Sequence, residues 1–421
     1  MTTIRVLITL ALHNNWSILQ LDVSNAFLHG DLQEDVYMKQ PQGFKDPIHP
    51  NFVCKLNKSI YGLKQSPRQW FSKITSSLRA FGFTFSKADP SLLIYTKDRT
   101  SIFVLIYVDD ILVTGNDKST ITLLLKQLHS SFKLKQLGDI SLFLGIQVDK
   151  TPTGYFLHQQ HYAKQLLHTA GFNNSKAALT PMSLKQSTAI HTQASFSDPK
   201  LYRKLAGSLQ YLSITRPDIA FTTNYICQHM HDPSVADFQT LKRLLRYIQG
   251  TVALGIPIDR GDLQLRAFAD ADWAADHTDR RSITGFCTFL GSTIISWSAK
   301  KQVTVAKSST EAEYRDISSV TSEVIWLRRL LAELHIPQTE PTTLYCDNTS
   351  AIALANNPVF HARTKHIELD YHFISDHIKA DAIKILHMSS AEQPADILTK
   401  PLPKDRFLFL RSKLNIRYPD V

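Results

Sequence analysis

The chain of 421 residues has little cysteine, and its four cysteines lie far apart: Cys54, Cys227, Cys287 and Cys346. No CxxC pair or zinc spacing is present, which argues against a disulfide scaffold and favours a reducing intracellular setting. The sequence also lacks an apolar run of the roughly 18–20 residues that cross a bilayer, and it has no signal-peptide pattern at its start. With 15 Gly and 18 Pro, it has too little of either for a collagen-like or low-complexity protein. We therefore expect a soluble intracellular protein with no membrane partner.

The charge balance points to a polyanionic partner. Lys and Arg number 47 against 37 Asp and Glu, which gives a net charge of +10, while 43% of the residues are hydrophobic. Such a balance alone is weak evidence for nucleic acid, but it excludes an acidic or largely disordered chain. The length leaves room for two or three domains.

The alternation of strand-like and helix-like stretches divides the chain into parts. Residues 1–182 mix both kinds, which predicts an α+β domain. Residues 183–261 begin with a polar linker and continue with amphipathic patterns typical of helices at Leu201–Leu212 and Ser234–Gln249. Residues 262–403 start with three strands, continue with a long helix and then alternate, which predicts a compact α/β domain, and residues 404–421 form a tail.

Three carboxylates stand out in the first part. Asp109 and Asp110 lie between apolar, β-type residues and should cap a tight hairpin, where Asn-Gly or Asp-Gly is usual. Two adjacent carboxylates repel each other, and a divalent cation would remove that repulsion. Taken alone, a solvated Asp-rich turn is an equal alternative. Asp22, at the end of the strand-like stretch Ile18–Val23, completes a set suited to two-metal phosphoryl transfer.

Four further carboxylates recur in the last part. Asp270 and Asp347 each close a strand-like stretch, Asp396 follows a later strand, and Glu313 lies on the inward stripe of the long predicted helix. Asp272 faces the same side of its strand as Asp270 and is the alternative ligand. For Glu313 the alternative is a capping box, in which Thr310 caps the helix and Glu313 returns the hydrogen bond.

The residues around the first carboxylate set resemble the reverse transcriptase of copia-type LTR retrotransposons. The resemblance rests on four stretches in the family's order: Leu21–Leu32, Ser59–Arg68, Tyr107–Asp110 and Phe143–Ile146. It implies that Asp22, Asp109 and Asp110 are catalytic metal ligands. It also implies nucleotide or template binding by Phe27, Lys64, Gln65, Arg68 and Tyr107, with Phe27 as the bulky gate against a ribose 2′-OH. Without the motif, Phe27 reads as a core aromatic and Gln65 as an exposed residue at a helix start.

The last part is similar to the ribonuclease H that follows the polymerase in the same elements. The similar stretches are Ser296–Gln302, Ser308–Tyr314 and Ala395–Leu402. They imply that Asp270, Glu313, Asp347 and Asp396 are catalytic metal ligands. The family uses two Mg²⁺ ions in each active site, with Mn²⁺ as a substitute. Arg363 and Lys365 lie in another matching stretch and could hold the hybrid backbone, although a solvated loop is an equal alternative.

The chain is thus identified as an N-terminally truncated member of the copia-type Pol polyprotein family. The expected fold is an α+β palm (an antiparallel sheet with helices) with partial fingers, a helical thumb or connection, and an α/β RNase H-like domain with a mixed five-stranded sheet. The implied partners are an RNA template, a DNA primer, dNTPs, RNA–DNA hybrids and other Pol or Gag products of the element, in cytoplasmic particles or the nucleus. Two alternatives stay open: a non-catalytic nucleic-acid-binding remnant, and an active RNase H joined to an inactive polymerase.

Overall fold

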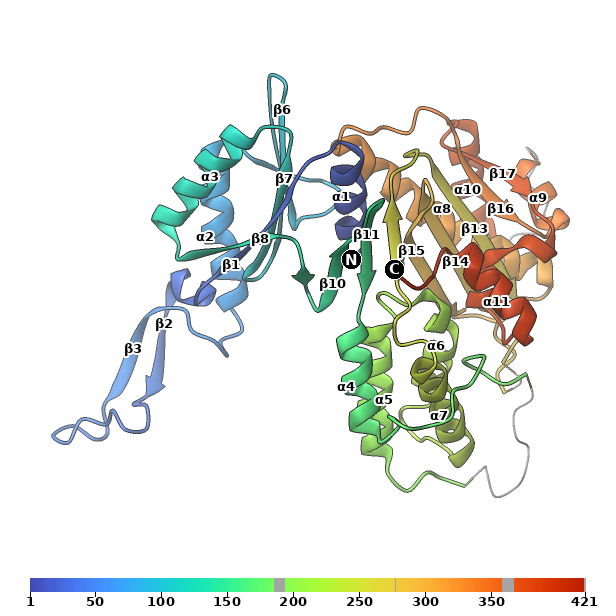
Figure 1. The fold of residues 1–421 in the computed structure, drawn as a ribbon, viewed down its shortest axis with the longest axis horizontal. Helices are drawn as coiled ribbons and strands as arrows, with labels where there is room; N and C mark the ends of the chain where they lie inside the picture. The colour runs from blue at the N-terminus through green and yellow to red at the C-terminus, as the bar shows by residue number, and fades with distance from the viewer. Residues whose placement is uncertain (185–193, 277, 358–366, 420–421) are drawn as a thin grey trace. The chain divides into compact units, whose positions relative to one another are not determined.

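The computed structural model describes residues 1–184, 194–276, 278–357 and 367–419 (Figure 1). The chain forms two compact units, one of Leu10–Leu144 and one of Met1–Thr9 with Gly145–Val421. Each unit combines helices with sheets, which confirms the predicted mixed class. None of the helices in the described part of the chain has both the length and the apolar character that a bilayer crossing requires.

The unit of Leu10–Leu144 is built on an antiparallel sheet of six strands in the order β4-β5-β6-β7-β1-β8. Their bounds are β1 Ile18–Val23, β4 Thr84–Phe85, β5 Leu92–Lys97, β6 Thr100–Tyr107, β7 Asp110–Gly115 and β8 Leu134–Asp139. Helices α2 (Ser66–Phe81) and α3 (Lys118–Ser131) share a hydrophobic core with this sheet, to which Trp70, Leu124 and Val104 belong. A short 3₁₀ turn, η1 (Ala26–His29), and a two-stranded ribbon of β2 (Asp31–Lys39) and β3 (Val53–Lys58) complete the unit.

In the other unit, an antiparallel arrangement of β10 (Ile146–Lys150), β11 (Gly154–His158) and β12 (Ile256–Asp259) accompanies four helices. These are α4 (Gln160–Ala170), α5 (Pro199–Leu212), α6 (Ala220–Gln228) and α7 (Val235–Gln249). A buried ion pair ties the segment together, because the Arg216 guanidinium donates two 2.8 Å hydrogen bonds to the Asp218 carboxylate. The Tyr247 hydroxyl donates a third hydrogen bond to Asp218 at 2.6 Å, so the buried Asp218 carboxylate has both a charged partner and hydrogen-bond donors.

The same unit contains a mixed sheet of five strands in the order β15-β14-β13-β16-β17. The bounds are β13 Leu265–Asp272, β14 Ile283–Leu290, β15 Thr293–Lys301, β16 Thr342–Cys346 and β17 Ile383–His387. Strand β14 runs antiparallel to both β13 and β15, whereas β16 runs parallel to both β13 and β17. All eight residues of β14 are buried, because elements cover both faces of the sheet.

Helix α8 (Ser309–Glu333) packs against β13, β14 and β16 (Figure 1). The 3₁₀ turn η6 (Pro394–Leu398) contacts β13 and β14 as well. Gly285 of β14 lies opposite Asp270 of β13, and a Cβ at Gly285 would come within 2.5 Å of Thr399 and 2.9 Å of Leu398. A glycine here therefore lets the end of η6 approach the strand that carries Asp270. Helices α9 (Thr349–Asn356), α10 (Glu368–Lys379) and α11 (Lys404–Lys413) complete the unit, and α1 (Thr2–His13) starts the chain.

Candidate active sites

The predicted hairpin is present, but its loop begins one residue earlier than expected. Strands β6 and β7 are joined by Val108 and Asp109, and Asp110 already pairs with Tyr107 as the first residue of β7. The left-handed conformation falls on Val108, with φ 58°. In this kind of two-residue loop only the first residue needs a positive φ, so neither Asp109 nor Asp110 has to adopt the left-handed conformation.

The strained loop is held by two backbone contacts. A β-branched residue at positive φ is unfavourable, so the conformation needs support from its surroundings. The Trp70 indole Nε1 donates to the Val108 carbonyl oxygen at 2.7 Å, and the Val23 amide donates to the Asp109 carbonyl oxygen at 3.1 Å. Helix α2 and strand β1 thus fix the position from which the Asp109 side chain projects.

Asp22 lies directly opposite Asp110 in the β1–β7 register, so the three predicted carboxylates are neighbours at one end of the sheet. Partial burial raises the pKa of Asp110, and the charges of Asp109 and Asp22 raise it further. The Lys135 ammonium is 3.9 Å from Asp22 and largely exposed, so it offsets little of this repulsion. Among the described residues, the groups whose ligand atoms all lie within 4.8 Å of one another belong to the other unit.

Two aromatic side chains lie beside this carboxylate set. The ring of Phe27, half-buried against the core, has its centroid 4.5 Å from that of Tyr61. Burial raises the pKa of Tyr61, and the charges of Asp109 and Asp22 add to the rise. Phe27 therefore fits the core alternative in part, yet contacts a phenol close to the carboxylates. Tyr61 was not predicted as a site residue, although it lies inside the matching stretch Ser59–Arg68. Tyr107, which was predicted, is half exposed.

Lys64, Gln65 and Arg68 surround the start of α2. Gln65 is the residue before the first helical turn, and Lys64 and Arg68 are exposed. Cations near a helix N-terminus oppose the helix dipole, so they do not stabilise α2.

The second carboxylate set is gathered at one edge of the five-stranded sheet. Because β13 and β16 are parallel, Asp270 in β13 and Asp347 after β16 lie toward the same edge. Ligand atoms of Asp270, Asp347 and Asp396 lie within 4.8 Å of one another, as do those of Glu313, Cys346 and Asp347. Asp347 is common to both groups. Of the alternatives Asp270 and Asp272, the structure brings Asp270 into the group.

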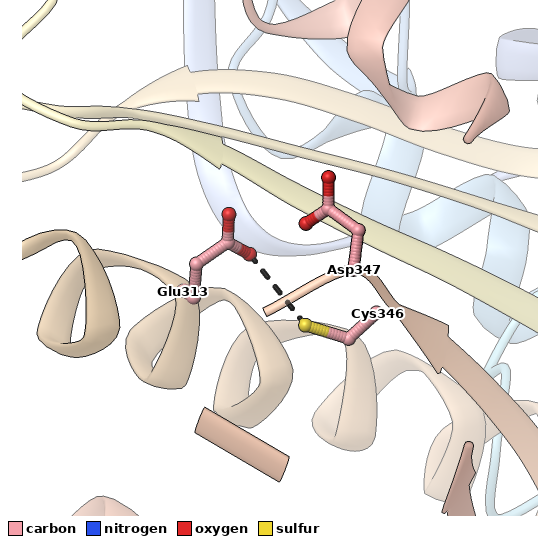
Figure 2. Close-up of side chains that lie close together, drawn as sticks. All are labelled: Glu313, Cys346 and Asp347. Carbon is pink, nitrogen blue, oxygen red and sulfur yellow. Dashed lines mark hydrogen bonds between the residues drawn. The ribbon is translucent and has the colours of Figure 1, made fainter. Parts of the chain in front are cut away.

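The capping-box interpretation of Glu313 is wrong. Helix α8 is capped by Ser308, whose side chain accepts a hydrogen bond from the Glu311 amide. The Glu311 carboxylate in turn accepts a hydrogen bond from the Lys307 amide at 2.9 Å. The helix starts two residues earlier than that interpretation requires, so Glu311 takes the N-terminal role. Glu313 is 5% exposed, and its Oε2 lies 3.8 Å from the Cys346 sulfur beside Asp347 (Figure 2).

Burial dominates the electrostatics of this set. It raises the pKa of Asp270 to about 7 and that of Glu313 to about 9, and neighbouring carboxylates contribute to both shifts. Asp316, one turn after Glu313 on α8, is fully buried and was not predicted as part of the site. Burial, together with the charges of Glu313 and Asp270, raises its pKa well above the ordinary value. Its three-residue spacing from Glu313 was the available signal.

Two basic side chains, also missed, compensate this negative charge. The Lys400 ammonium is 3.4 Å from Asp270 and 3.0 Å from Asp396, and Arg406 is 2.9 Å from the other oxygen of Asp396. Thr399 donates a hydrogen bond to Asp270. The predicted hybrid-binding residues Arg363 and Lys365 lie outside the described residues.

The donor atoms of both sets suit a hard divalent cation. Carboxylate oxygens are the ligands that Mg²⁺ and Mn²⁺ prefer in proteins. In the second set, Asp270, Glu313 and Asp396 are buried, where charged carboxylates are costly unless cations balance them, and Lys400 and Arg406 supply only part of that balance. The residues present therefore fit such an ion, with Asp270, Glu313, Asp347 and Asp396 as its potential ligands.

Comparison with known proteins agrees with these features. Residues 1–184 match the family described as reverse transcriptase (RNA-dependent DNA polymerase). The chain is 44% identical over 99% of its length to the retrovirus-related Pol polyprotein from transposon RE1 of Arabidopsis thaliana, covering 28% of that protein. It is 38% identical over 97% of its length to the one from transposon TNT 1-94 of Nicotiana tabacum, covering 31%. An uncharacterized mitochondrial protein of Arabidopsis thaliana is 48% identical over 53% of this chain and 94% of its own length.

The matches define a class, that of reverse transcriptase sequences from retrotransposons. More specifically, the chain belongs to the copia-type Pol polyprotein family, and it spans less than a third of the Pol polyproteins it matches. Among solved structures, the foamy viral protease-reverse transcriptase in complex with dsDNA aligns with 89% of this chain and 68% of that chain. The identity is 10% and the TM-score 0.46, a weak likeness on which nothing below depends.

Proposed function

We propose that the chain carries two centres for phosphoryl transfer, an RNA-directed DNA polymerase and a ribonuclease H. The first uses Asp22, Asp109 and Asp110 to extend a DNA primer on an RNA template. The second uses Asp270, Glu313, Asp347 and Asp396 to hydrolyse the RNA strand of an RNA–DNA hybrid. In this proposal residues 1–182 are the palm with partial fingers, 183–261 the thumb or connection, and 262–403 the RNase H-like domain.

The observation that carries the proposal is the arrangement of the second set. Asp347 is common to two groups of ligand atoms, each within 4.8 Å, one with Asp270 and Asp396 and the other with Glu313 and Cys346. Its carboxylate therefore lies between Glu313 and the two other aspartates, where two cations could share it. Bound Mg²⁺ would supply the charge that activates the attacking oxygen and stabilises the leaving oxygen. Asp270, Glu313 and Asp396 orient that charge from buried positions, where water cannot displace them easily.

In the first centre, the chain's own residues supply the platform. Asp22 and Asp110 present carboxylates from adjacent strands, and Asp109 projects from the loop that Trp70 and Val23 hold. Phe27 and Tyr61 provide an aromatic surface beside the carboxylates. Lys64, Gln65, Arg68 and Tyr107 would contact the template or the incoming nucleotide.

A specific observation favours a second candidate function, an active RNase H joined to an inactive polymerase. The tight ligand groups found among the described residues are both in the RNase H-like part, whereas the palm carboxylates form none. The experiment offers the full chain a labelled RNA–DNA hybrid and a primed RNA template, each with Mg²⁺ or with EDTA.

Mg²⁺-dependent hybrid cleavage together with primer extension would support both centres. Cleavage without extension would leave the second candidate function. Hybrid binding with neither activity would contradict the proposal and favour a non-catalytic nucleic-acid-binding protein.

A further inference from the structure

Lys400 lies between two carboxylates of the second set. Its ammonium nitrogen lies 3.4 Å from Asp270 Oδ2 and 3.0 Å from Asp396 Oδ1, so it bridges two of the predicted ligands. Both carboxylate side chains are almost fully buried, at 2% and 7% exposure, while the lysine side chain is 32% exposed. Lys400 thus places a positive charge where three carboxylates converge and keeps a path to solvent.

The local backbone holds this lysine in place. The Lys400 amide donates to the Asp396 carbonyl oxygen at 3.3 Å, and the preceding residue, Thr399, donates its hydroxyl proton to Asp270. Gly285 leaves the space in which Thr399 approaches β13. The bridge is therefore built into the end of η6 and is not the chance position of a flexible surface side chain.

Arg406 differs from Lys400 in a way that matters for exchange. It contacts the opposite oxygen of Asp396, Oδ2, at 2.9 Å, and it also donates to the backbone carbonyl oxygens of Ser390 and Ala391. Arg406 is thus anchored by three acceptors and leaves Asp396 Oδ1 to Lys400. Asp396 would keep one cationic partner if Lys400 moved away.

Given the proposed function, on which this step rests, we infer that Lys400 is a built-in counter-ion that a divalent cation displaces. Its ammonium neutralises Asp270 and Asp396 while the site holds no metal ion, and it leaves both oxygens when the ion binds. Lys400 is a positioning residue in this account: it keeps the ligand cluster folded and ready, and it sets how strongly the ion must compete for the site.

The chain offers a matched control for the stability effect. Lys301 also bridges two carboxylates, at 2.5 Å from Asp276 and 2.9 Å from Asp279, and its side chain is 21% exposed. Neither aspartate belongs to the candidate ligand groups found among the described residues. Lys301→Met therefore removes the same kind of bridge away from the proposed metal site. Arg406→Met removes a charge at a similar distance from Asp396 without opening the Asp270–Asp396 bridge.

The test measures thermal unfolding of the full chain in EDTA and in Mn²⁺, and Mn²⁺ binding by the loss of its free EPR signal. All proteins carry Asp110→Asn, which weakens Mn²⁺ binding at the other carboxylate set. We expect Lys400→Met to lower Tm in EDTA. We also expect Mn²⁺ to raise the Tm of this variant by more than it raises the Tm of the parent with Lys400. Its Mn²⁺ affinity should rise about tenfold, because the ion no longer displaces an ammonium.

Lys301→Met should lower Tm by the same amount in EDTA and in Mn²⁺. Arg406→Met should change the Mn²⁺ affinity by less than Lys400→Met does. Lys400→Gln, which keeps a neutral hydrogen-bond donor, replaces Lys400→Met if the latter does not fold. Unchanged or weaker Mn²⁺ binding by the Lys400 variants, beside clear binding by their parent, would overturn the inference alone. Absence of Mn²⁺ binding in both the parent and the variants would overturn the proposed metal site together with the inference.

Discussion

The repulsion between neighbouring carboxylates is reduced in a different way in each of the two sets. Asp22, Asp109 and Asp110 are partly exposed on a hairpin and a neighbouring strand, where solvent screens their repulsion. Asp270, Glu313 and Asp396 are buried, and Lys400 and Arg406 compensate the charge. The comparison shows that solvent reaches the carboxylates of the first set, whereas the buried carboxylates of the second set need positively charged partners within the chain.

Asp347→Asn should have the largest effect on the buried set. It removes the carboxylate common to both ligand groups, so we expect hybrid cleavage to fall by more than about 100-fold, beyond the loss typical of outer-shell partners. Asp381→Asn is the matched control, because Asp381 is exposed and its positive φ of 50° suits asparagine. Equal cleavage by Asp347→Asn and Asp381→Asn proteins would contradict the assignment.

Asp110→Asn should have a comparable effect on the exposed set, but on primer extension. Burial and, after it, neighbouring charges raise the pKa of Asp110, so a neutral amide relieves both costs and Tm should not fall. Asp98→Asn is the control, since Asp98 lies in the turn of the adjacent hairpin with φ 54°. Extension that persists in Asp110→Asn protein would exclude Asp110 from the chemistry.

Replacing Glu311 and Glu313 separately divides capping from metal binding on the first turns of α8. Glu313→Gln should abolish most hybrid cleavage while preserving the helix start. Glu311→Gln should weaken the Lys307 and Arg315 contacts, lower stability by about 1 kcal/mol and leave most cleavage intact. Thermal unfolding and hybrid cleavage, measured on both variants, check this, and reversed outcomes would restore the capping interpretation of Glu313.

Trp70→Phe should have the smallest effect. The variant keeps an aromatic ring of smaller size and removes the hydrogen bond to the Val108 carbonyl, which is worth about 1 kcal/mol. The smaller ring also leaves a cavity in the core, which lowers stability further. The strained loop should then hold Asp109 less firmly, so primer extension should slow by about tenfold with hybrid cleavage unchanged. Slower cleavage together with slower extension would indicate general misfolding instead.

The sequence predicted these sites where local pattern decides geometry. Asp347 follows β16 directly, and Glu313 follows the inward stripe of a long helix, so strand ends and helical spacing pointed to both. Asp270 was expected to close its strand, but β13 continues to Asp272, and only the family resemblance favoured Asp270 over Asp272. The β6–β7 hairpin was predicted too, but its loop was misplaced by one residue because Val108 takes the unfavourable φ that its tertiary contacts tolerate.

Other site residues depend on contacts that no local pattern reveals. Lys400 follows Asp396 by only four residues, but its second partner, Asp270, lies on β13, far away in the sequence. Arg406 reads as an ordinary basic residue until α11 brings it to Asp396. Tyr61 reads as part of a motif with no role until its ring meets Phe27. Pairings between distant segments are decided by the packing of the whole unit, and a single sequence does not display them.

If the chain holds two separate centres, replacing one carboxylate in each should abolish one activity and spare the other. Wild-type, Asp110→Asn and Asp347→Asn proteins would be given a labelled hybrid and a primed template in parallel reactions with Mg²⁺. The account predicts that Asp110→Asn protein loses extension and keeps cleavage, while Asp347→Asn protein loses cleavage and keeps extension. Loss of both activities in either variant, or of neither in both, would contradict it.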